Sequence, residues 1–459
     1  MSERHFTWES TLPYSQEDVF AWHERPGAFA RLNPPWRPVS VVSEAPSLRD
    51  GSFITLKLPF LGPINLEWTL EHFGYRPPDQ FCDRQISGPF TSWEHRHLFA
   101  PRSRTSSSLQ DEITFKLPWL FAPAVPFIKA ELARLFTFRH QLLRADMDLH
   151  ARFTKQKQKK ILISGSSGFI GTALTAFLET AGHSVFRLVR REPQTPQERR
   201  WNPSSGQLSP DALDDMDAVI HLGGENLFGH RWTPEFKEKI KKSRVDTTLL
   251  LCKTIAHLRK KPDVVIIASA TGFYGETGST QVDEKDPAGT GFLADTCRAW
   301  ENASSEAIGG SCRLVHLRLG TVLSPGGGAL QKMLPPFKAG FGGILGSGDQ
   351  YMSWISLHDL LGIFEYALHS DSMNGPHNAV APTPVTNREF TKTLGKVLHR
   401  PTLVPTPAFV LRGVFGEIAD AILLSSSRVV PAALLARGYT FQHPSLENAL
   451  RFELGLPST

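Results

Sequence analysis

A glycine-rich loop is the clearest chemical feature of the sequence. Residues 165–171 contain three glycines, directly after the apolar run Ile161–Ile163 and at the start of a helical pattern that ends near Gly182. Such glycines permit a tight turn and a close approach of a pyrophosphate, which the N–H groups at the helix start attract. We therefore predict a dinucleotide site, and glycines that only shape the turn are the weaker interpretation. The predicted contacts are Gly165, Gly168, Phe169, Ile170 and Gly171.

Two arginines, Arg190 and Arg191, follow the next apolar run, which ends near Val189. At this position a carboxylate would hold the ribose 2′-hydroxyl of NAD, whereas a guanidinium pair suits the 2′-phosphate of NADP(H). The pair therefore favours NADP(H). Two alternatives stay open: the arginines only solvate the end of a strand, or Glu192 binds the ribose of NAD.

Polar residues after a further apolar run, Ala218–Leu222, are candidates for proton transfer. Glu225 is a candidate general base and Asn226 a candidate hydrogen-bond donor, although capping of the following segment explains Glu225 equally well. His221 lies inside the apolar run. We expect it to be a core histidine with satisfied hydrogen bonds rather than a ligand.

The composition is typical of a packed globular protein. Of 459 residues, 41% are hydrophobic and 21% charged, which argues against disordered, collagen-like and coiled-coil classes. The net charge of +5 is thinly spread, so no nucleic-acid partner is expected. The four cysteines lie far apart, so we expect no metal site, no disulfide framework and a cytoplasmic protein. No secretory signal or membrane-spanning run is apparent.

Strand-like runs alternate with helical stretches after Lys160, which predicts βαβ units and a parallel sheet. Binding groups in such a sheet lie at the carboxyl ends of the strands. The pattern beyond about Pro382 is mostly helical. The predicted strands are Ile161–Ser164, Ser184–Val189, Ala218–Leu222, Val264–Ser269 and Leu314–Leu319, and the predicted C-terminal helices are Asn387–Leu398, Ala408–Leu424 and Pro431–Arg437.

Residues 1–153 show short alternating runs between Pro/Gly turns instead, which predicts an antiparallel sheet. A helical pattern from about Val125 to Phe153 follows these runs. A sheet wrapped around one long helix can enclose an apolar pocket. The charged run Lys155–Lys160 indicates a linker to the rest of the chain.

Separated motifs along the second part of the chain resemble the extended short-chain dehydrogenase/reductase superfamily, and more narrowly its "epimerase family protein" branch. The resemblance covers nearly all of residues 160–454 and implies a Rossmann-like doubly wound parallel sheet with a helical C-terminal subdomain. The motifs that carry it are Gly165–Gly171, His221–Asn226, Arg231–Pro234, Ser243-Arg244, Gly326–Gly328 and Ser353–Ile355.

The first part more loosely resembles the α+β START-like fold of polyketide cyclases and lipid-transport proteins, through Leu135–Arg144 on the final helix. That resemblance implies an apolar ligand. The expected organisation is therefore a START-like domain over residues 1–153, a linker over 154–160, a Rossmann domain over 161–380 and a helical subdomain over 381–459.

The superfamily resemblance also implies further cofactor contacts. Leu222 and Gly223 would pass beneath the adenosine and pyrophosphate half, and Val322 would flank the nicotinamide end. Arg244 falls on a helix that lines the cofactor in related enzymes, where it would bond ribose or phosphate; a salt bridge on the helix surface is an equal alternative.

The catalytic pair of the superfamily, Tyr-x-x-x-Lys, is missing. Cys297 stands in place of the tyrosine and Glu301 in place of the lysine. We expect Glu301 either to face the ribose or to point to solvent or pair with Arg298. Ser269 or Thr271 could polarise a substrate carbonyl, as the superfamily hydroxyl does, whereas Tyr274 is expected to be a structural aromatic.

Three functions remain open at this stage. The leading one is an NADP(H)-dependent oxidoreductase or epimerase-like enzyme of unknown small-molecule substrate, with a fused apolar-ligand-binding domain. The second is a non-catalytic protein in which NADP(H) serves structure or redox sensing. The third makes lipid or isoprenoid binding by residues 1–153 the main activity.

Overall fold

The computed structural model describes residues 3–37, 39–43, 45, 47–61 and 64–457. The chain divides into two compact units. The first holds the residues up to Arg152 together with Glu179–Gly182 and Leu454–Pro457, and the second holds Phe153–Leu178 and His183–Glu453.

The first unit is built on a seven-stranded antiparallel sheet, with the order β1-β7-β6-β5-β4-β3-β2. From β4 to β7, consecutive strands are joined by short turns, as the Pro/Gly punctuation predicted. Three strands, β3, β4 and β7, contain the alternating runs that the sequence marked. The strands are β1 (Arg4–Leu12), β2 (Ser40–Ser43), β3 (Phe53–Leu61), β4 (Ile64–Arg76), β5 (Gln80–Ser87), β6 (Ser92–Ser103) and β7 (Ser106–Lys116).

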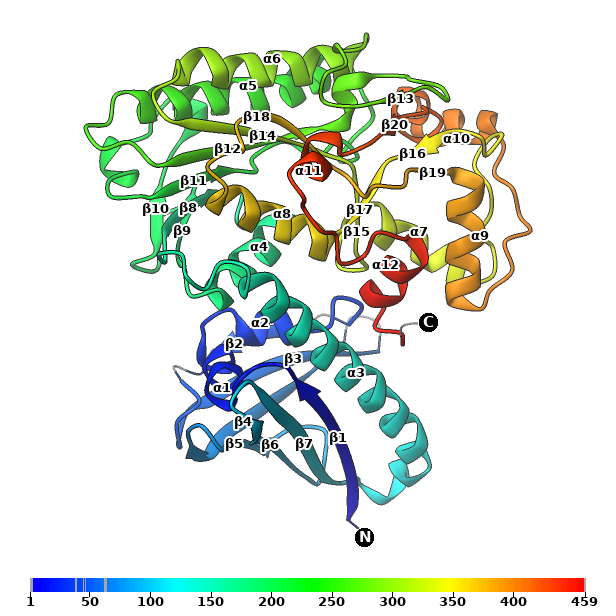
Figure 1. Ribbon diagram of the computed structural model, residues 1–459. Helices are drawn as coiled ribbons and strands as arrows, with labels where there is room; N and C mark the ends of the chain where they lie inside the picture. Colours follow the sequence, from blue (N-terminus) through cyan, green and yellow to red (C-terminus); the bar gives the residue numbers. More distant parts are fainter. Residues whose placement is uncertain (1–2, 38, 44, 46, 62–63, 458–459) are drawn as a thin grey trace. The chain divides into compact units, whose positions relative to one another are not determined.

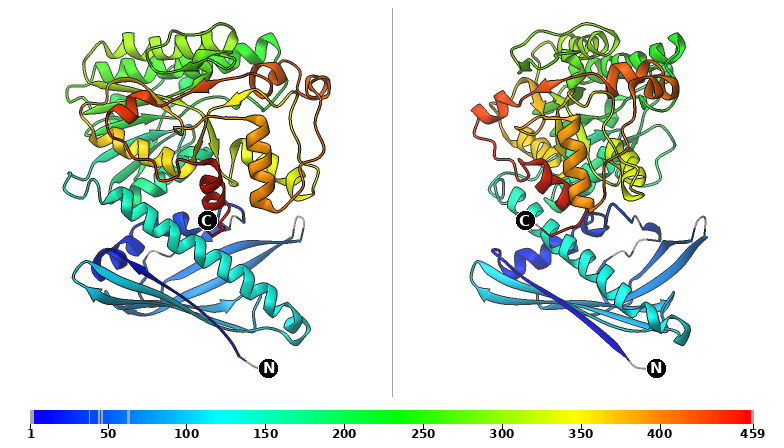
Figure 2. Two further views of the ribbon diagram at one scale, coloured as in Figure 1. Left: turned by 45° about the vertical axis from the view of Figure 1, so that its right-hand side comes forward. Right: turned by 90° about the vertical axis from the view of Figure 1, so that its right-hand side faces the viewer.

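The predicted long helix is α3 (Val125–His150), which crosses one face of this sheet (Figure 2). Two short helices, α1 (Gln16–Glu24) and α2 (Ala28–Leu32), complete the unit. The helical spacing of apolar residues along α3 buries one side of it in two separate clusters. Phe136 belongs to the cluster with Trp93 and Phe115, and Leu143 belongs to the cluster with Phe81 and Phe99.

The second unit contains a seven-stranded sheet with the order β10-β9-β8-β11-β12-β14-β18, and every pairing in it is parallel. The five predicted strands all occur, and β8, β11 and β12 are buried on both faces, as continuous apolar runs indicate. The strands are β8 (Lys160–Ser164), β9 (Ser184–Val189), β10 (Glu198–Arg200), β11 (Ala218–His221), β12 (Val264–Ala270), β14 (Arg313–Leu319) and β18 (Gly375–Ala379).

Helices cover both faces of this sheet (Figure 1). The helices α5 (Pro234–Ala256) and α6 (Phe292–Ile308) lie on one face, and α4 (Phe169–Thr180) and α8 (Leu357–His369) lie on the other (Figure 1). The architecture is therefore the predicted Rossmann-like, doubly wound parallel sheet.

The C-terminal region contains α9 (Asn387–Leu398), α10 (Ala408–Phe415), α11 (Ala432–Ala436) and α12 (Leu446–Glu453). The predicted continuous helix Ala408–Leu424 is wrong. Gly416 has a φ of +60° and ends α10, and only a short helical turn, Ala419–Leu423, follows. A glycine in the left-handed region is a usual way to stop a helix. Among the described residues, no helix has the length and apolar character needed to cross a membrane.

We expect Phe136→Ala to lower the free energy of unfolding of the first unit by about 3–5 kcal/mol. Phe136 is 2% exposed, so its removal leaves a cavity between α3 and the sheet. The matched control is Phe127→Ala on the same helix, where the ring is 66% exposed and the change should stay within about 0.5 kcal/mol. Urea unfolding of the full chain measures both, and equal effects would contradict the described packing.

Candidate functional site

Three loops of the second unit meet at one edge of the parallel sheet. Ser164 of β8 lies opposite His221 of β11, and His221 lies opposite Ile267 of β12. The strands β8 and β11 therefore end at the same level, β12 continues three residues further to Ala270, and the segments that follow all three leave the sheet at the same edge. The chain continues from β8 to β9 on one side and later returns to β11 on the other side, which makes the β8–β11 boundary the switch point where doubly wound sheets bind ligands.

The glycine loop at this edge has little space for side chains. Gly165 has a φ of +73°, and a Cβ there would lie 3.0 Å from the carbonyl carbon of Leu222. A Cβ on Gly171 would lie 2.1 Å from the carbonyl oxygen of Gly165. Because only hydrogen fits at Gly171, α4 starts directly against the loop. Ser167 and Gly168 are exposed at this start, and the N–H of Gly168 donates to the carbonyl oxygen of Gly165 at 3.0 Å. The exposed backbone of Ser167 can therefore be reached by an anion.

Phe169 and Val322 come close together beside this loop. Val322 lies in β15 (Thr321–Leu323), which pairs with β17 (Trp354–Ser356). A Cβ on Gly328 would lie 3.4 Å from the Val322 carbonyl oxygen and 3.6 Å from the Phe169 ring. The structure therefore brings these two predicted cofactor contacts to the same place, although they are far apart in sequence.

The two arginines after β9 differ in their surroundings. Arg191 forms a bidentate ion pair with Glu198, at 2.5 and 2.8 Å, and the Arg191 guanidinium holds the pKa of Glu198 down at about 2. Glu192 pairs with Arg200. Arg190 is exposed, and in the described part of the chain no ion pair is found for it. Of the two predicted phosphate contacts, Arg190 is therefore the one whose guanidinium is not engaged by a carboxylate among the described residues.

The loop after β11 is held by Arg244. Its guanidinium donates to the backbone carbonyl of Glu225 at 3.0 Å and lies over the Trp300 ring at 5.4 Å from the ring centre. The surface salt bridge considered for Arg244 is wrong, because the side chain is half-buried and donates to backbone carbonyls. Glu225 itself pairs with Lys239 at 3.1 Å across a partly exposed surface.

His221 is a buried core histidine, as expected. It hydrogen bonds with Ser164 and Thr247, and burial lowers its pKa to about 4. The ring is therefore neutral at physiological pH. A Cβ on Gly223 would lie 3.1 Å from the ring, so the histidine fills the space beneath the loop that contains Leu222 and Gly223.

A buried polar cluster replaces the missing catalytic pair. Glu301 Oε1 accepts hydrogen bonds from Ser269 Oγ at 2.7 Å and from Arg318 Nε at 2.9 Å, and its Oε2 accepts from Arg318 Nη2 at 2.8 Å. Arg318 also donates to the hydroxyl of Tyr274, which donates to Asn378 Oδ1, both at 2.8 Å. Tyr274 is thus a structural aromatic, and burial raises its pKa to about 12.

The expected positions of Glu301 need correction. Arg298 pairs with Asp295 at 2.7 Å, not with Glu301, which is only 7% exposed. Both carboxylate oxygens of Glu301 accept hydrogen bonds from neighbouring side chains, so no free charge is directed at a ribose. The partner that sequence reasoning missed is Arg318 on β14, and no local spacing pointed to it.

Cys297 and Thr271 complete the neighbourhood. Burial, with a smaller contribution from the charge of Glu301, raises the pKa of the Cys297 thiol to about 12, so it is not an activated nucleophile. Thr271 begins a short turn, Thr271–Tyr274, and is half-buried. Of the two predicted hydroxyls, Ser269 is engaged with Glu301, whereas Thr271 lies nearer to the open edge of the sheet.

Comparison with known proteins identifies relatives of the second unit. Residues 161–380 match the NAD dependent epimerase/dehydratase family, and residues 406–453 match a domain of unknown function, DUF1731. An epimerase family protein of Mycobacterium bovis is 45% identical over 297 residues, which are 65% of this chain and 98% of that protein. The human epimerase family protein SDR39U1 is 38% identical over 295 residues, which are 64% and 98%.

Two solved structures are also similar. A nucleoside-diphosphate sugar epimerase from Corynebacterium glutamicum has a TM-score of 0.81 and 33% identity, over 98% of this chain and 90% of that one. Human SDR39U1 (isoform 2), solved with NADPH, has a TM-score of 0.58 and 36% identity, over 64% and 98%. The first of these similarities includes the first unit, which the family matches do not cover.

We expect Glu301→Gln to lower the free energy of unfolding of the second unit by about 3–5 kcal/mol, because it leaves the Arg318 charge buried without a carboxylate. The matched control is Asp295→Asn on the same helix, which breaks an exposed ion pair and should cost at most about 1 kcal/mol. Thermal and urea unfolding measure both variants. An equally small effect of the two substitutions would contradict the buried pair.

Proposed function

Because this chain belongs to the NAD dependent epimerase/dehydratase family, we propose that it binds NADP(H) and acts as an epimerase-like oxidoreductase on a small-molecule substrate in the cytoplasm. The observation that carries the cofactor proposal is the backbone of residues 165–171 at the start of α4, which we call the cradle. There the carbonyl oxygen of Gly165 occupies the space that a side chain on Gly171 would need. A pyrophosphate fits against such a backbone and its free N–H groups.

The exposed Arg190 supports NADP(H) rather than NAD. A 2′-phosphate at the end of β9 would meet this guanidinium, while Arg191, through its pair with Glu198, keeps the turn in place. Glu192 is engaged with Arg200, which makes it a poor partner for a ribose hydroxyl. The NADPH in the human relative agrees with this preference.

A bound NADP(H) would supply hydride-transfer chemistry. The glycine loop would hold its pyrophosphate, Phe169 and Val322 would line one side of it, and Arg244 holds the loop after β11. We assign the substrate-polarising hydroxyl to Thr271 rather than Ser269, because Ser269 already donates to Glu301. Glu225 remains the candidate base at the neighbouring strand end.

A second candidate is a non-catalytic protein in which NADP(H) is a structural or redox-sensing ligand. One observation favours it: the place of the Tyr-x-x-x-Lys pair is taken by a buried thiol and by a carboxylate paired with Arg318. Both groups are engaged in holding the protein together. Because burial raises the pKa of the Cys297 thiol to about 12, this group cannot supply a proton near neutral pH in the way that the superfamily tyrosine does.

For the first unit we propose a START-like fold that takes up an apolar ligand. The support is α3 lying across one face of the antiparallel sheet, with two apolar clusters between the helix and the sheet (Figure 2). A fluorescent lipid probe that fails to bind the full chain would contradict this assignment.

We expect the purified protein to bind NADPH more tightly than NADH, by about tenfold or more, because one charge-assisted contact to the 2′-phosphate distinguishes them. Arg190→Ala should remove most of this difference, and Arg191→Ala should remove less, since that guanidinium is paired with Glu198. Calorimetric titration of both cofactors measures the ratio. Equal affinities for NADPH and NADH in the unaltered protein would exclude the proposed role of Arg190.

We expect turnover when NADPH- or NADP-loaded protein is incubated with a panel of nucleotide sugars and other carbonyl or hydroxyl metabolites. The absorbance of reduced nicotinamide reports net oxidation or reduction, and chromatography of the products reports epimerisation. With an active substrate in hand, Thr271→Val should slow turnover about a hundredfold, within the range for loss of one oxygen-polarising donor. Tight NADPH binding without any turnover would instead favour the non-catalytic candidate.

A further inference from the structure

A group of titratable side chains lies inside the first unit, far in sequence from the proposed cofactor site. Asp83 on β5 lies opposite His95 on β6, and His97 on β6 lies opposite Asp111 on β7. Because alternate residues of a strand share a face, all four side chains project from the same face of the sheet. Asp83, His95 and Asp111 are buried, and the side chain of His97 is 12% exposed.

Asp111 fixes how the histidine rings are protonated. Its Oδ1 lies 2.8 Å from His95 Nε2 and 2.8 Å from His97 Nδ1, and its Oδ2 lies 2.6 Å from His140 Nε2 on α3. A carboxylate accepts hydrogen bonds, so each ring nitrogen that faces it carries a hydrogen. In the neutral rings, His95 Nδ1 and His97 Nε2 are then the nitrogens with free lone pairs.

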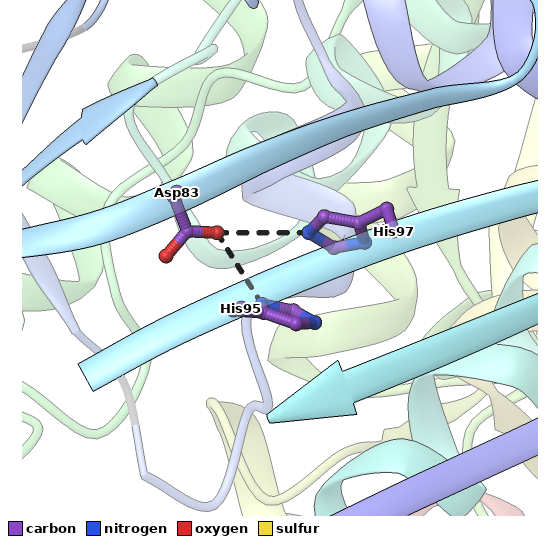
Figure 3. A group of neighbouring side chains, drawn as sticks. All are labelled: Asp83, His95 and His97. Atoms are coloured by element: carbon purple, nitrogen blue, oxygen red, sulfur yellow. Dashed lines mark ion pairs between the residues drawn. The ribbon is translucent and has the colours of Figure 1, made fainter. Parts of the chain in front are cut away.

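These two nitrogens face the same oxygen of Asp83 (Figure 3). His95 Nδ1 lies 3.3 Å and His97 Nε2 lies 3.7 Å from Asp83 Oδ2. Three electron-pair donors therefore converge on one buried point. A hydrogen on His95 could bridge the shorter gap, but 3.7 Å is beyond hydrogen-bond distance, so protonation alone does not account for His97.

We propose that Asp83, His95 and His97 bind a divalent transition-metal ion of the Zn²⁺ class. Two imidazoles and one carboxylate form a ligand set that such ions prefer. Metal–ligand bonds of about 2.0–2.1 Å at tetrahedral angles place neighbouring ligand atoms roughly 3.3–3.5 Å apart, close to the two separations from Asp83 Oδ2. The three ligand atoms all lie within 4.8 Å of one another.

Asp111 is the orienting carboxylate of this site. Metal-binding histidines usually donate their second ring nitrogen to a carboxylate or carbonyl, which fixes the tautomer and the ring orientation. Here a single carboxylate does so for both rings, and it is itself held by His140. Asp111 is thus a positioning residue rather than a ligand.

A small cavity lies on the Asp111 side of the proposed site. His97 and Asp111 line it together with Arg139, His140 and His23, whereas Asp83 and His95 are not among its lining residues. Three protein ligands leave a fourth coordination position, which a water molecule would fill. Within the described part of the chain, His140 Nδ1 is buried without a hydrogen-bond partner.

The position of the cluster speaks against a purely structural role. It lies between the two apolar clusters of the unit: Phe136 of one contacts His95, and Phe81 of the other stacks on His97. Two buried carboxylates and several imidazoles at such a position cost desolvation free energy that apolar residues of similar size would not. The proposal does not depend on cofactor binding by the second unit.

The test is metal binding by the full chain after removal of metals with a chelator. Titration with Co²⁺ should give visible absorption bands that saturate at one ion per chain, and Zn²⁺ should displace the cobalt. Asp83→Asn and His97→Asn should each weaken binding by a hundredfold or more, and Asp111→Asn should weaken it about 10–100-fold. Circular dichroism verifies that each variant is folded; should Asp83→Asn not fold, His97→Asn at the cavity takes its place.

The matched control is His369→Gln. His369 belongs to the other group of described residues whose geometry resembles a metal site, with His183 and Glu365. This variant should keep full cobalt binding. The proposal is overturned if the unaltered chain binds neither Co²⁺ nor Zn²⁺ at micromolar concentrations, or if binding survives in His97→Asn and is lost in His369→Gln.

Discussion

The contact between Gly171 and the carbonyl of Gly165 is the constraint on which the site of the second unit depends. With 2.1 Å between that oxygen and a Cβ built on Gly171, any side chain would push α4 away from β8. Because Gly171 has no side chain, the first turn of α4 lies against the loop, and Ser167 and Gly168 are exposed at the start of the helix. Gly165 is also pressed against Leu222, so the same constraint couples the loop after β8 to the loop after β11.

Much of the fold was predictable from local pattern. The strands β8, β11 and β12 are buried on both faces, which makes each of them a largely apolar run that the sequence displays directly. The strands β9 and β14 are recognisable through shorter apolar stretches interrupted by Arg187 and by His316 and Arg318. The helix α3 was equally visible, through its apolar spacing. The helix expected over Ala408–Leu424 failed at one residue, Gly416, whose positive φ cannot be deduced from composition because glycine is also tolerated within helices.

The site was predictable only where its residues are close in sequence. The glycine loop and the arginine pair were visible as motifs. The ion pair between Arg191 and Glu198 was not visible, and because of this pair Arg190 is the candidate for phosphate binding. Glu301 was expected near a ribose or solvent, yet its partner Arg318 comes from a different element. Likewise Asp83, His95 and Asp111 lie on three different strands, so no short motif marks the histidine–carboxylate group that they form. Pairing across strands is set by register, which one sequence shows poorly.

The central claim is that the glycine loop and the end of β9 bind NADP(H). A crystal structure of the protein grown with NADPH tests this most directly. The account predicts the pyrophosphate at the start of α4, in contact with backbone N–H groups between Ser166 and Ile170, and the 2′-phosphate beside Arg190. A structure in which NADPH binds elsewhere, or in which the cradle stays empty at saturating NADPH, would contradict the account.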